Sequence, residues 1–487
     1  MRGFFLALLA MWVIAGDSGR SPEQLVRNAA HAPTPYWLLW EASKQGEEDA
    51  EAALVELAAG ANRQYWLRQL VSLGNADAAW ALHELIDDEQ VNSATLMRLA
   101  AKGNVPEAQL EYALSTDNPE QRVKWLKRAA AQAYLPAQIS LADWYLLNQQ
   151  YDQARPLLAI TSQKDAQSAF QYGRLLWDEG DTDTGMQYLE KAAQEGHAQA
   201  TAFVSLLGRF EPVSASQVEA VNWPSQCRQR IALFATSLST LSRASELYTK
   251  FQKDTRLNTL PLCLSQPVWL NSDATTCTST AEGANRLSCD ITSLDKAVLS
   301  SGATHIVLVA EQGKASVENG VMYLDMTDTY SVFVHELAHF SGFADEYPMS
   351  VDVAERACSQ QSAPNLVFDG TLTYRPVQRV THWQTLSAGA GVWPSKSCEA
   401  IGIAAYKPSG SITFMEHHDS GEIPPLYLKL WRAQLLRPAA QRPVFMNLFQ
   451  AFHKRGEQEN AGIWLRKYNE FNRAQEPALQ KVNAKED

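Results

Sequence analysis

The sequence contains no long run of basic residues. Its 42 lysines and arginines are outnumbered by 54 aspartates and glutamates, which gives a formal net charge of −12. An acidic chain is repelled by phosphate backbones, so we expect no nucleic acid partner. The lack of a basic cluster also argues against binding to an anionic membrane surface.

Long apolar segments are scarce as well. The run at residues 4–15 follows a single arginine, and its length of roughly a dozen apolar residues fits the core of a signal peptide better than a membrane span. Val13 and Ala15 offer a small-x-small cleavage site. We predict a signal peptide over residues 1–19 and no membrane span after its removal. An uncleaved anchor is the alternative.

Cysteine is absent from the first 226 residues, and no two cysteines form a C-x-x-C pair, which argues against a zinc ribbon. The second half carries six cysteines: Cys227, Cys263, Cys277, Cys289, Cys358 and Cys398. An even number behind a signal peptide predicts disulfides, and hence the periplasm or the outside of a bacterial cell. Spacing favours Cys277 with Cys289, and then Cys358 with Cys398. Buried free thiols are the alternative.

A short phrase recurs along the first half of this chain of 487 residues, which is too long for one compact core. The phrase reads GEEDAEAALVEL from Gly46, GNADAAWALHEL from Gly74 and GNVPEAQLEYAL from Gly103, and it returns more loosely from Ala133, Lys164 and Gly196. A second helical stretch lies between successive phrases. Each unit of about 28 to 32 residues therefore predicts two helices and a turn.

Alanine recurs at the fifth or sixth position of each phrase, at Ala50, Ala79, Ala108, Ala137, Ala169 and Ala200. Small residues there let paired helices approach closely, and stacked units bury the apolar face that one unit leaves open. The phrases resemble tetratricopeptide-like repeats of the SEL type, most closely in LEKAAQEGHAQA at residues 189–200. The resemblance covers residues 33–210. It implies an all-α solenoid that docks a protein partner or substrate, or that only supports the next domain.

The repeats end near residues 211–212, and the pattern that follows mixes helix and strand. We predict an amphipathic helix over residues 228–253 and a buried strand at THIVLVAE, residues 304–311. A second strand at NGVMYLDM, residues 319–326, opens with an Asn-Gly turn. A helix is expected from Tyr330.

That helix carries the sequence H-E-x-x-H at His335, Glu336 and His339. Residues four apart lie on one helical face, so both imidazoles can reach one zinc ion, and Glu336 can take a proton from the water that the ion holds. Gly342 follows three residues after the second histidine, where the helix must end in a sharp turn. Asp345 comes three residues later.

The phrase H-E-x-x-H-x-x-G-x-x-D resembles the metzincin pattern, with Asp345 in place of the usual third histidine. The adjacent FADEY at residues 343–347 is similar to the zinc endopeptidases of the immunoglobulin A peptidase family. The resemblance implies zinc held by His335, His339 and Asp345. Glu346 is the competing third ligand, and a turn-forming role is the alternative for Asp345.

A metzincin also places a methionine turn beneath the metal, and PSGSITFMEHHDSGEIPP offers Met415 in such a turn. The family often has tyrosine two residues later, where this sequence has His417, followed by His418. An imidazole can donate the same hydrogen bond to an oxyanion, so we predict this role for His417. A surface histidine pair, and plain core packing of Met415, are the alternatives. VMYLDM is expected to be the edge strand that pairs with an extended substrate.

These patterns predict a multidomain protein, an all-α helical repeat solenoid followed by an α+β zincin-like metallopeptidase domain over residues 225–435. Residues 436–487 are expected to form a C-terminal helical extension. The implied function is an exported zinc metalloendopeptidase, with Glu336 as general base and a protein or peptide as substrate. The alternative is a protein-binding scaffold whose zinc domain is inactive or structural.

Overall fold

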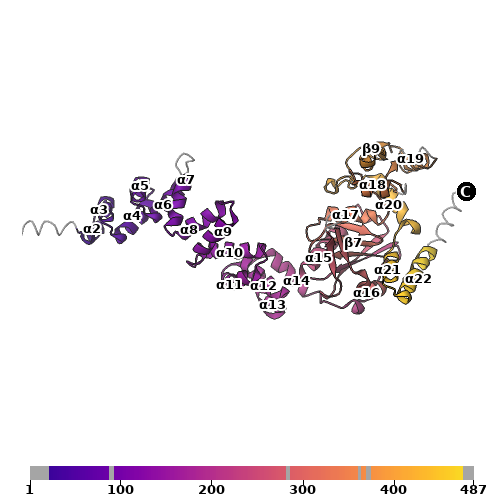
Figure 1. The fold of residues 1–487 in the computed structure, drawn as a ribbon, viewed down its shortest axis with the longest axis horizontal. Coiled ribbons are helices and arrows are strands. Elements are labelled where there is room, and N and C mark those ends of the chain that lie inside the picture. Colours follow the sequence, from indigo (N-terminus) through magenta and orange to yellow (C-terminus); the bar gives the residue numbers. More distant parts are fainter. Residues whose placement is uncertain (1–20, 87–92, 281–285, 360–362, 369–373, 475–487) are drawn as a thin grey trace, which may run out of the picture. The chain divides into compact units, whose positions relative to one another are not determined.

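The computed structural model describes residues 21–86, 93–280, 286–359, 363–368 and 374–474, and its contacts divide the chain into two units, residues 1–204 and 205–487 (Figure 1). The predicted signal peptide at residues 1–19 lies outside the described residues. No helix in the described ranges is long and apolar enough to cross a membrane.

The first unit is a helical repeat domain with no strand in its described residues. Its helices are α2 (Pro22–Ala29), α3 (Tyr36–Ser43), α4 (Glu48–Gly60), α5 (Gln64–Ser72), α6 (Ala76–Leu85), α7 (Ser93–Lys102), α8 (Pro106–Ser115), α9 (Pro119–Ala130), α10 (Leu135–Leu147), α11 (Tyr151–Thr161), α12 (Ala166–Asp178), α13 (Thr182–Gln194) and α14 (Ala198–Leu207). The recurring phrase forms α4 and every second helix after it, and the stretch between phrases forms the others. The predicted helix pairs are confirmed.

The core of this unit runs through the whole array. All six recurring alanines are 0% exposed, because they lie where neighbouring helices meet and a larger side chain would push the helices apart. Polar caps define where helices begin: the side chain of Asn75 accepts a hydrogen bond from Ala78 N at 2.8 Å, and Asp165 accepts one from Ser168 N at 2.7 Å.

The second unit is built on a mixed five-stranded sheet of order β2-β1-β5-β7-β6. Its strands are β1 (Gln229–Ala235), β2 (Leu262–Trp269), β5 (His305–Val309), β6 (Ser316–Glu318) and β7 (Val321–Leu324). Adjacent strands are parallel except β6, which pairs antiparallel with β7 and forms one edge. A separate sheet holds β8 (Val367–Phe368), β10 (Ala405–Lys407) and β9 (Trp393–Ser395), and β3 (Cys277–Thr280) pairs with β4 (Arg286–Cys289).

Helices cover both faces of the five-stranded sheet, which is why every residue of β5 and β7 is buried. Helix α15 (Leu238–Lys253) packs on β1 and β2, and α17 (Tyr330–His339) packs on β6 and β7. The opposite face is covered by α16 (Asp295–Ser301), α21 (Val444–Lys454) and α22 (Gln458–Ala474). The remaining helices are α18 (Val351–Ser359), α19 (Tyr374–Leu386) and α20 (Pro425–Leu435).

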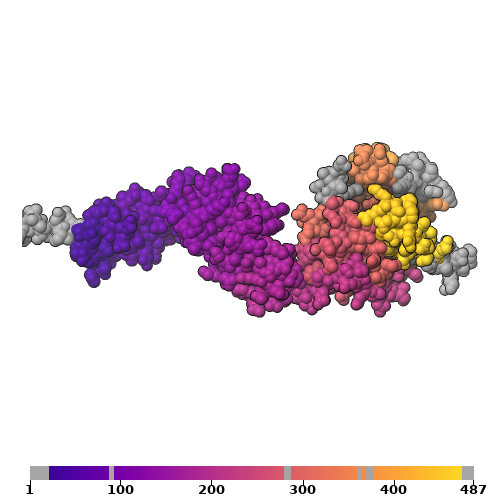
Figure 2. Space-filling model, turned by 60° about the horizontal axis from the view of Figure 1, so that its bottom comes forward, coloured from indigo at the N-terminus to yellow at the C-terminus, as the bar shows by residue number. Residues whose placement is uncertain are grey.

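Three details differ from the sequence-based predictions. Residues 228–253 are not one helix, because 229–235 form the buried strand β1 before α15 begins. The strand within VMYLDM is not an edge strand, since β7 lies between β5 and β6. Helices α21 and α22, expected outside the 225–435 domain, share a hydrophobic core with the sheet and lie against the second unit (Figure 2, yellow).

The predicted strands and disulfides are otherwise present. THIVLVAE forms β5, and the Asn-Gly pair forms the turn between β6 and β7, with positive φ at both Asn319 and Gly320. The predicted pairs Cys277–Cys289 and Cys358–Cys398 are confirmed, and the third disulfide joins Cys227 to Cys263. Disulfides of this kind each add about 2–4 kcal/mol of stability.

His305, at the start of β5, makes the stability of the second unit depend on pH. Its ring is 0% exposed, lies tilted against Phe340 with the centroids 4.7 Å apart, and contacts Thr304 Oγ1 at 2.9 Å through Nδ1. Burial lowers the pKa of His305 from 6.5 to about 3. The folded protein therefore binds fewer protons than the unfolded chain between these two values, and the stability present above pH 6.5 is lost as the pH falls towards 3.

We expect the free energy of unfolding to lose up to about 1.4 kcal/mol per pH unit from this residue across that window. His305→Gln, which cannot titrate there, should flatten the dependence in denaturant unfolding of the full chain at pH 7, 6, 5 and 4. The exposed His382 gives a matched control, His382→Gln, which should follow the parent. Equal slopes for the parent and His305→Gln would contradict this assignment.

Candidate metal centre

Helix α17 brings His335, Glu336 and His339 to the wall of a cavity. Thr329 caps the helix by accepting from Val332 N at 3.5 Å, and the helix ends at His339. Gly342 then takes a φ of 78°, a left-handed conformation that a residue with a Cβ rarely adopts. This turn leads the chain back so that Asp345 faces the two histidines.

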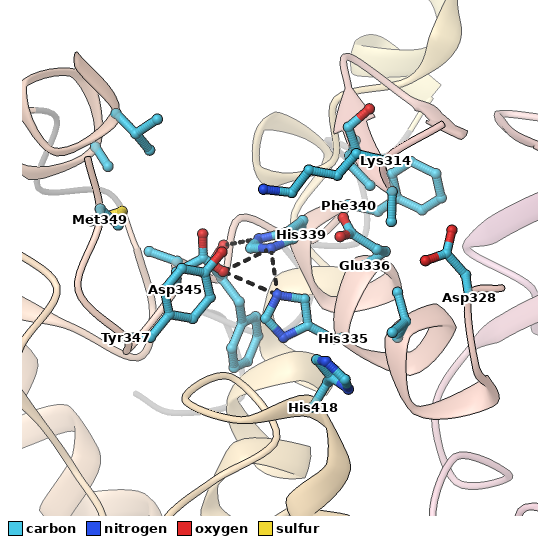
Figure 3. A pocket seen from close by; sticks show the side chains of 18 of the residues that line it. Lys314, Asp328, His335, Glu336, His339, Phe340, Asp345, Tyr347, Met349 and His418 are labelled. Carbon is cyan, nitrogen blue, oxygen red and sulfur yellow. Dashed lines mark hydrogen bonds and ion pairs between the residues drawn. The ribbon is translucent and has the colours of Figure 1, made fainter. Parts of the chain in front are cut away.

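The three side chains converge on a single point. Asp345 Oδ1 lies 3.0 Å from His335 Nε2 and 3.2 Å from His339 Nε2, and the two Nε2 atoms are 3.2 Å apart (Figure 3). Each imidazole is oriented from its other nitrogen: Nδ1 of His335 donates to Phe414 O, and Nδ1 of His339 donates to Phe343 O, both at 2.8 Å. A carbonyl oxygen only accepts, so Nδ1 carries the proton and a neutral ring keeps its Nε2 lone pair towards the centre.

This donor set fits a zinc ion. Ligand atoms about 2.0–2.2 Å from one tetrahedral ion lie about 3.3–3.5 Å apart, close to the distances between these three atoms. Asp345 Oδ1 is buried and has no hydrogen-bond partner in the described part of the chain. Three acceptors at this distance repel one another unless positive charge lies between them. Two imidazoles and a carboxylate, each oriented by its neighbours, are a donor set that zinc takes.

Without a metal, the charges of the three groups couple strongly. Burial opposes ionisation of Asp345, but attraction to His339 and His335 lowers the pKa of this carboxyl below its usual range. Burial likewise opposes charge on His339, but the carboxylate of Asp345 raises the pKa of that imidazole to about 10. A metal ion would take the place of the imidazole proton, so binding of zinc releases a proton at neutral pH.

Glu336 lies on the other side of the histidines from Asp345 (Figure 3). It is 9% exposed and lines the cavity, and its carboxylate is within 4.8 Å of the histidine nitrogens. The Asp345 oxygen lies 3.0 and 3.2 Å from the same nitrogens, so both carboxylates stand near the histidine pair, and Asp345 is the third ligand that the sequence motif predicts. The structure brings together every residue that the H-E-x-x-H-x-x-G-x-x-D phrase singled out.

Asp328 was not singled out from the sequence, yet it faces Glu336 across the cavity wall (Figure 3). Burial first, and then the charges of Asp325 and Glu336, raise the pKa of Asp328 to about 6, while Arg243 opposes the shift. Its Oδ2 accepts a hydrogen bond from Asp325 N at 2.7 Å. The only signal for Asp328 in the sequence was its position directly before the residue that caps α17.

Glu346, the competing ligand, points away from the histidines. It is 1% exposed, and its carboxylate accepts hydrogen bonds from Asn365 Nδ2 at 2.9 Å, Thr413 Oγ1 at 2.6 Å and Tyr427 OH at 2.6 Å. Lys407 Nζ lies 3.5 Å away. These partners occupy both carboxylate oxygens of Glu346. This residue therefore holds the segment around Asp345 in place and does not reach the metal centre.

The segment predicted as a methionine turn contacts the candidate metal centre through its main chain. Phe414 O accepts a hydrogen bond from His335 Nδ1. Met415 is 0% exposed, and its main-chain oxygen accepts a hydrogen bond from Glu346 N at 2.9 Å. Thr413 accepts from Met415 N through its hydroxyl at 3.2 Å. The turn therefore connects the first ligand to the segment that carries the third.

The histidine pair after this turn is less defined. His417 and His418 both line the cavity, and their rings stack at 5.4 Å, with His417 exposed. His418 Nδ1 lies 3.0 Å from Asp419, which accepts from Ser331 Oγ at 2.7 Å and so ties this turn to α17. The structure does not single out His417 over His418 as an oxyanion donor.

Tyr347 is the neighbouring aromatic that the sequence analysis passed over. It lines the cavity, is 41% exposed, and its ring lies nearly parallel to that of His335, with centroids 6.3 Å apart (Figure 3). Its hydroxyl group is a second candidate for oxyanion stabilisation. Its place two residues after Asp345, inside FADEY, was the signal that could have identified it.

The neighbours Asp345 and Glu346 offer a test of this arrangement. Asp345→Ala should lower zinc content sharply, because it removes the oxygen that faces both histidines. Glu346→Gln should keep zinc but lower the stability by about 1–3 kcal/mol, because it leaves buried Lys407 with one carboxylate partner fewer. Zinc per chain and denaturant midpoints measured on both variants check this. A stable, zinc-free Glu346→Gln protein would move the ligand role to Glu346.

No protein-family model matches the chain, and no curated protein matches it. The solved structures that are similar to this chain include c5321, a protective antigen of uropathogenic Escherichia coli strains displaying an SLR fold, and a Sel1 repeat protein from Oxalobacter formigenes. The first is 20% identical over 36% of this chain and 44% of its own, with a TM-score of 0.29. The second is 16% identical over 34% of this chain and 82% of its own, with a TM-score of 0.27.

The chain thus spans less than half the length of the E. coli antigen. Both neighbours are described as repeat proteins, and the first unit here is a helical repeat domain. Because no family model matches the chain, the resemblance of residues 335–347 to the immunoglobulin A peptidase family stays a prediction from the sequence motif.

Proposed function

We propose that the second unit is a zinc-dependent endopeptidase. The observation that carries this proposal is the convergence of His335 Nε2, His339 Nε2 and Asp345 Oδ1 within 3.0–3.2 Å, with both imidazoles oriented by main-chain carbonyls. Bound there, zinc supplies a Lewis acid that polarises the scissile carbonyl and lowers the pKa of water. Residues of the chain supply the proton transfer and the orientation.

Glu336 is placed to move the proton. Its carboxylate lies beside the histidine nitrogens and makes no hydrogen bond in the described part of the chain. It can accept a proton from the attacking water and pass it to the leaving amine.

The edge strand β6 is placed to orient an extended peptide. Ser316 and Val317 of β6 line the cavity, and the outer side of the strand is unpaired with any other strand of the described sheet. An extended substrate can add to such an edge through main-chain hydrogen bonds. Tyr347 or His417 would then donate to the oxyanion from the opposite wall.

The proposed peptidase acts outside the cytoplasm. All six cysteines form disulfides, which persist in oxidising compartments such as the periplasm and the medium. A cleavage assay on casein tests the function: the purified full chain should digest it, lose activity with a chelator and regain it with zinc. Full activity in excess chelator, or none with zinc fully bound, would contradict the proposal.

A second function, protein binding, is favoured for the repeat unit by its charge and exposed aromatic residues. Residues 21–204 hold 25 Asp and Glu against 14 Lys and Arg, so nearly all of the net negative charge lies there. Trp37 is 59% exposed and Tyr65 62% exposed, and Trp66 contacts both rings. Aromatic side chains are enriched in protein interfaces. We propose that this surface docks a basic protein, either a substrate or a partner.

Docking of a substrate predicts a difference between large and small substrates. Changing Trp37 and Tyr65 together to serine should raise the KM for a basic protein substrate relative to the KM for a short peptide taken from it. The exposed Tyr151, on α11 of the same unit, gives the control Tyr151→Ser. An unchanged ratio of the two KM values would show that these aromatic residues do not dock the substrate.

A further inference from the structure

The cavity around the candidate metal centre carries positive charge that the proposed mechanism does not use. It has a volume of about 1290 Å³, and Lys314, Arg356 and Arg442 line it. Residues 205–487 as a whole are nearly balanced, with 26 Lys and Arg against 28 Asp and Glu. The cations of the cavity wall are therefore a local feature and not the consequence of a basic domain.

Three of the four carboxylates that line the cavity contact groups other than the cavity cations. Asp345 faces the histidines, and Asp328 lies beside Glu336. Glu416 forms an ion pair with Lys407, which is only 4% exposed. None of these four acidic side chains forms an ion pair with Lys314 in the part of the chain that the structure describes.

Lys314 lies on the cavity wall on the same side as His339 and Glu336 (Figure 3). Its side chain extends from the wall above His339 into the cavity, on the side where Glu336 and the three converging atoms lie (Figure 3). Across the described ranges its ammonium group has neither a hydrogen bond nor an ion pair. A substrate in the cavity would meet this charge directly.

The backbone that carries Lys314 is held in place. Gly313 N donates to Asp325 Oδ2 at 3.1 Å, and Gly313 takes a φ of 147°, which residues other than glycine rarely adopt. A Cβ on Gly313 would lie 2.8 Å from Leu287 Cβ, so the close packing there requires glycine. Lys314 O also accepts a hydrogen bond from Leu287 N, and β6 begins two residues later at Ser316.

We propose that Lys314 is a specificity-determining residue that selects peptides with a carboxylate side chain close to the scissile bond. This inference rests on the proposed peptidase function. A peptide lying along β6 passes beside Lys314 because the lysine precedes that strand by two residues and points into the same cavity. The ammonium attracts an aspartate or glutamate side chain of the peptide and repels a lysine or arginine at the same position.

Peptide sets that differ by one charge test the proposal. Each of the three positions on either side of the scissile bond is filled in turn with Glu, Gln or Lys, and kcat/KM is measured for the zinc-loaded full chain. The parent should prefer Glu over Lys about tenfold at one of these positions. Lys314→Met should abolish most of this preference, and Lys314→Glu should reverse it. Lys296, exposed on α16 and outside the cavity, gives the control Lys296→Met, which should keep it.

The same peptides are also measured for binding to the zinc-loaded Glu336→Gln variant by fluorescence anisotropy, with and without Lys314→Met. Cleavage by the parent without a preference for Glu, or a preference that survives in Lys314→Met, would overturn the role of Lys314 alone. Binding that prefers Glu through Lys314 without cleavage by the parent would instead reject the peptidase function. Loss of both activity and charge preference would reject both.

Discussion

Glu336→Gln is expected to lower peptide hydrolysis by about 10²–10⁴-fold while the protein stays folded and loaded with zinc. Glutamine has nearly the size of glutamate and keeps an acceptor oxygen, but it takes up no proton at neutral pH. In the structure Glu336 lies beside the ligand atoms, and Asp345 completes the set around the two histidines. Removing the base should therefore affect kcat and leave the metal in place.

Peptidase rates and zinc content measured on the same preparation check this result. The exposed Glu355 on α18 lies outside the cavity, so Glu355→Gln is a control that changes charge equally and should retain parental rates. Hydrolysis by Glu336→Gln at the parental rate would show that another group accepts the proton. Loss of zinc from this variant would make Glu336 a ligand.

The second large effect is expected from the histidines themselves. The parent should hold about one zinc ion per chain, and His335→Ala or His339→Ala should hold almost none, because each change removes one of three protein ligands. Inductively coupled plasma mass spectrometry after dialysis against a weak chelator measures this. The control His382→Ala, on α19 outside the cavity, should retain zinc.

Loss of zinc should also be separable from loss of folding. The partner atoms of the two rings, Phe414 O and Phe343 O, are main-chain carbonyls that water can satisfy in the truncated variants. Near-ultraviolet circular dichroism should therefore remain close to that of the zinc-free parent. Full zinc occupancy in either alanine variant would remove that histidine from the metal centre.

Local patterns predicted those parts of the fold that short-range geometry decides. The recurring phrases predicted the helix pairs because each repeat folds into the same two-helix unit, and all six alanines near their starts are buried. The spacing of His335 and His339 fixed their shared helical face in the same way. The left-handed φ of Gly342 follows from the turn that must bring Asp345 back.

Short sequence patterns could not predict features that depend on partners far away in the sequence. Asp345 and Glu346 are adjacent, and which one faces the histidines depends on Asn365, Thr413 and Tyr427, which take up the Glu346 carboxylate. The contacts that orient these two carboxylates thus include a residue 81 positions away in the sequence.

The order of the strands in the sheet also depends on partners far away in the sequence. The segment NGVMYLDM was predicted as a strand, but its place inside the sheet is fixed by pairing on both sides with β5 and β6. Residues 229–235 read equally well as the start of a helix, because a short apolar run fits a buried strand or a buried helix. The position of Lys314 depends on its contact with Leu287, which no local pattern indicates.

The most direct test of the metal centre is an anomalous difference map from crystals of the full chain, recorded on both sides of the zinc absorption edge. We predict one strong peak that appears only above the edge, about 2.0–2.2 Å from His335 Nε2, His339 Nε2 and Asp345 Oδ1. Glu336 and Glu346 should lie outside bonding distance of the peak. Zinc-soaked crystals with no peak at these three atoms, and with Asp345 still paired to a protonated His339, would contradict the account.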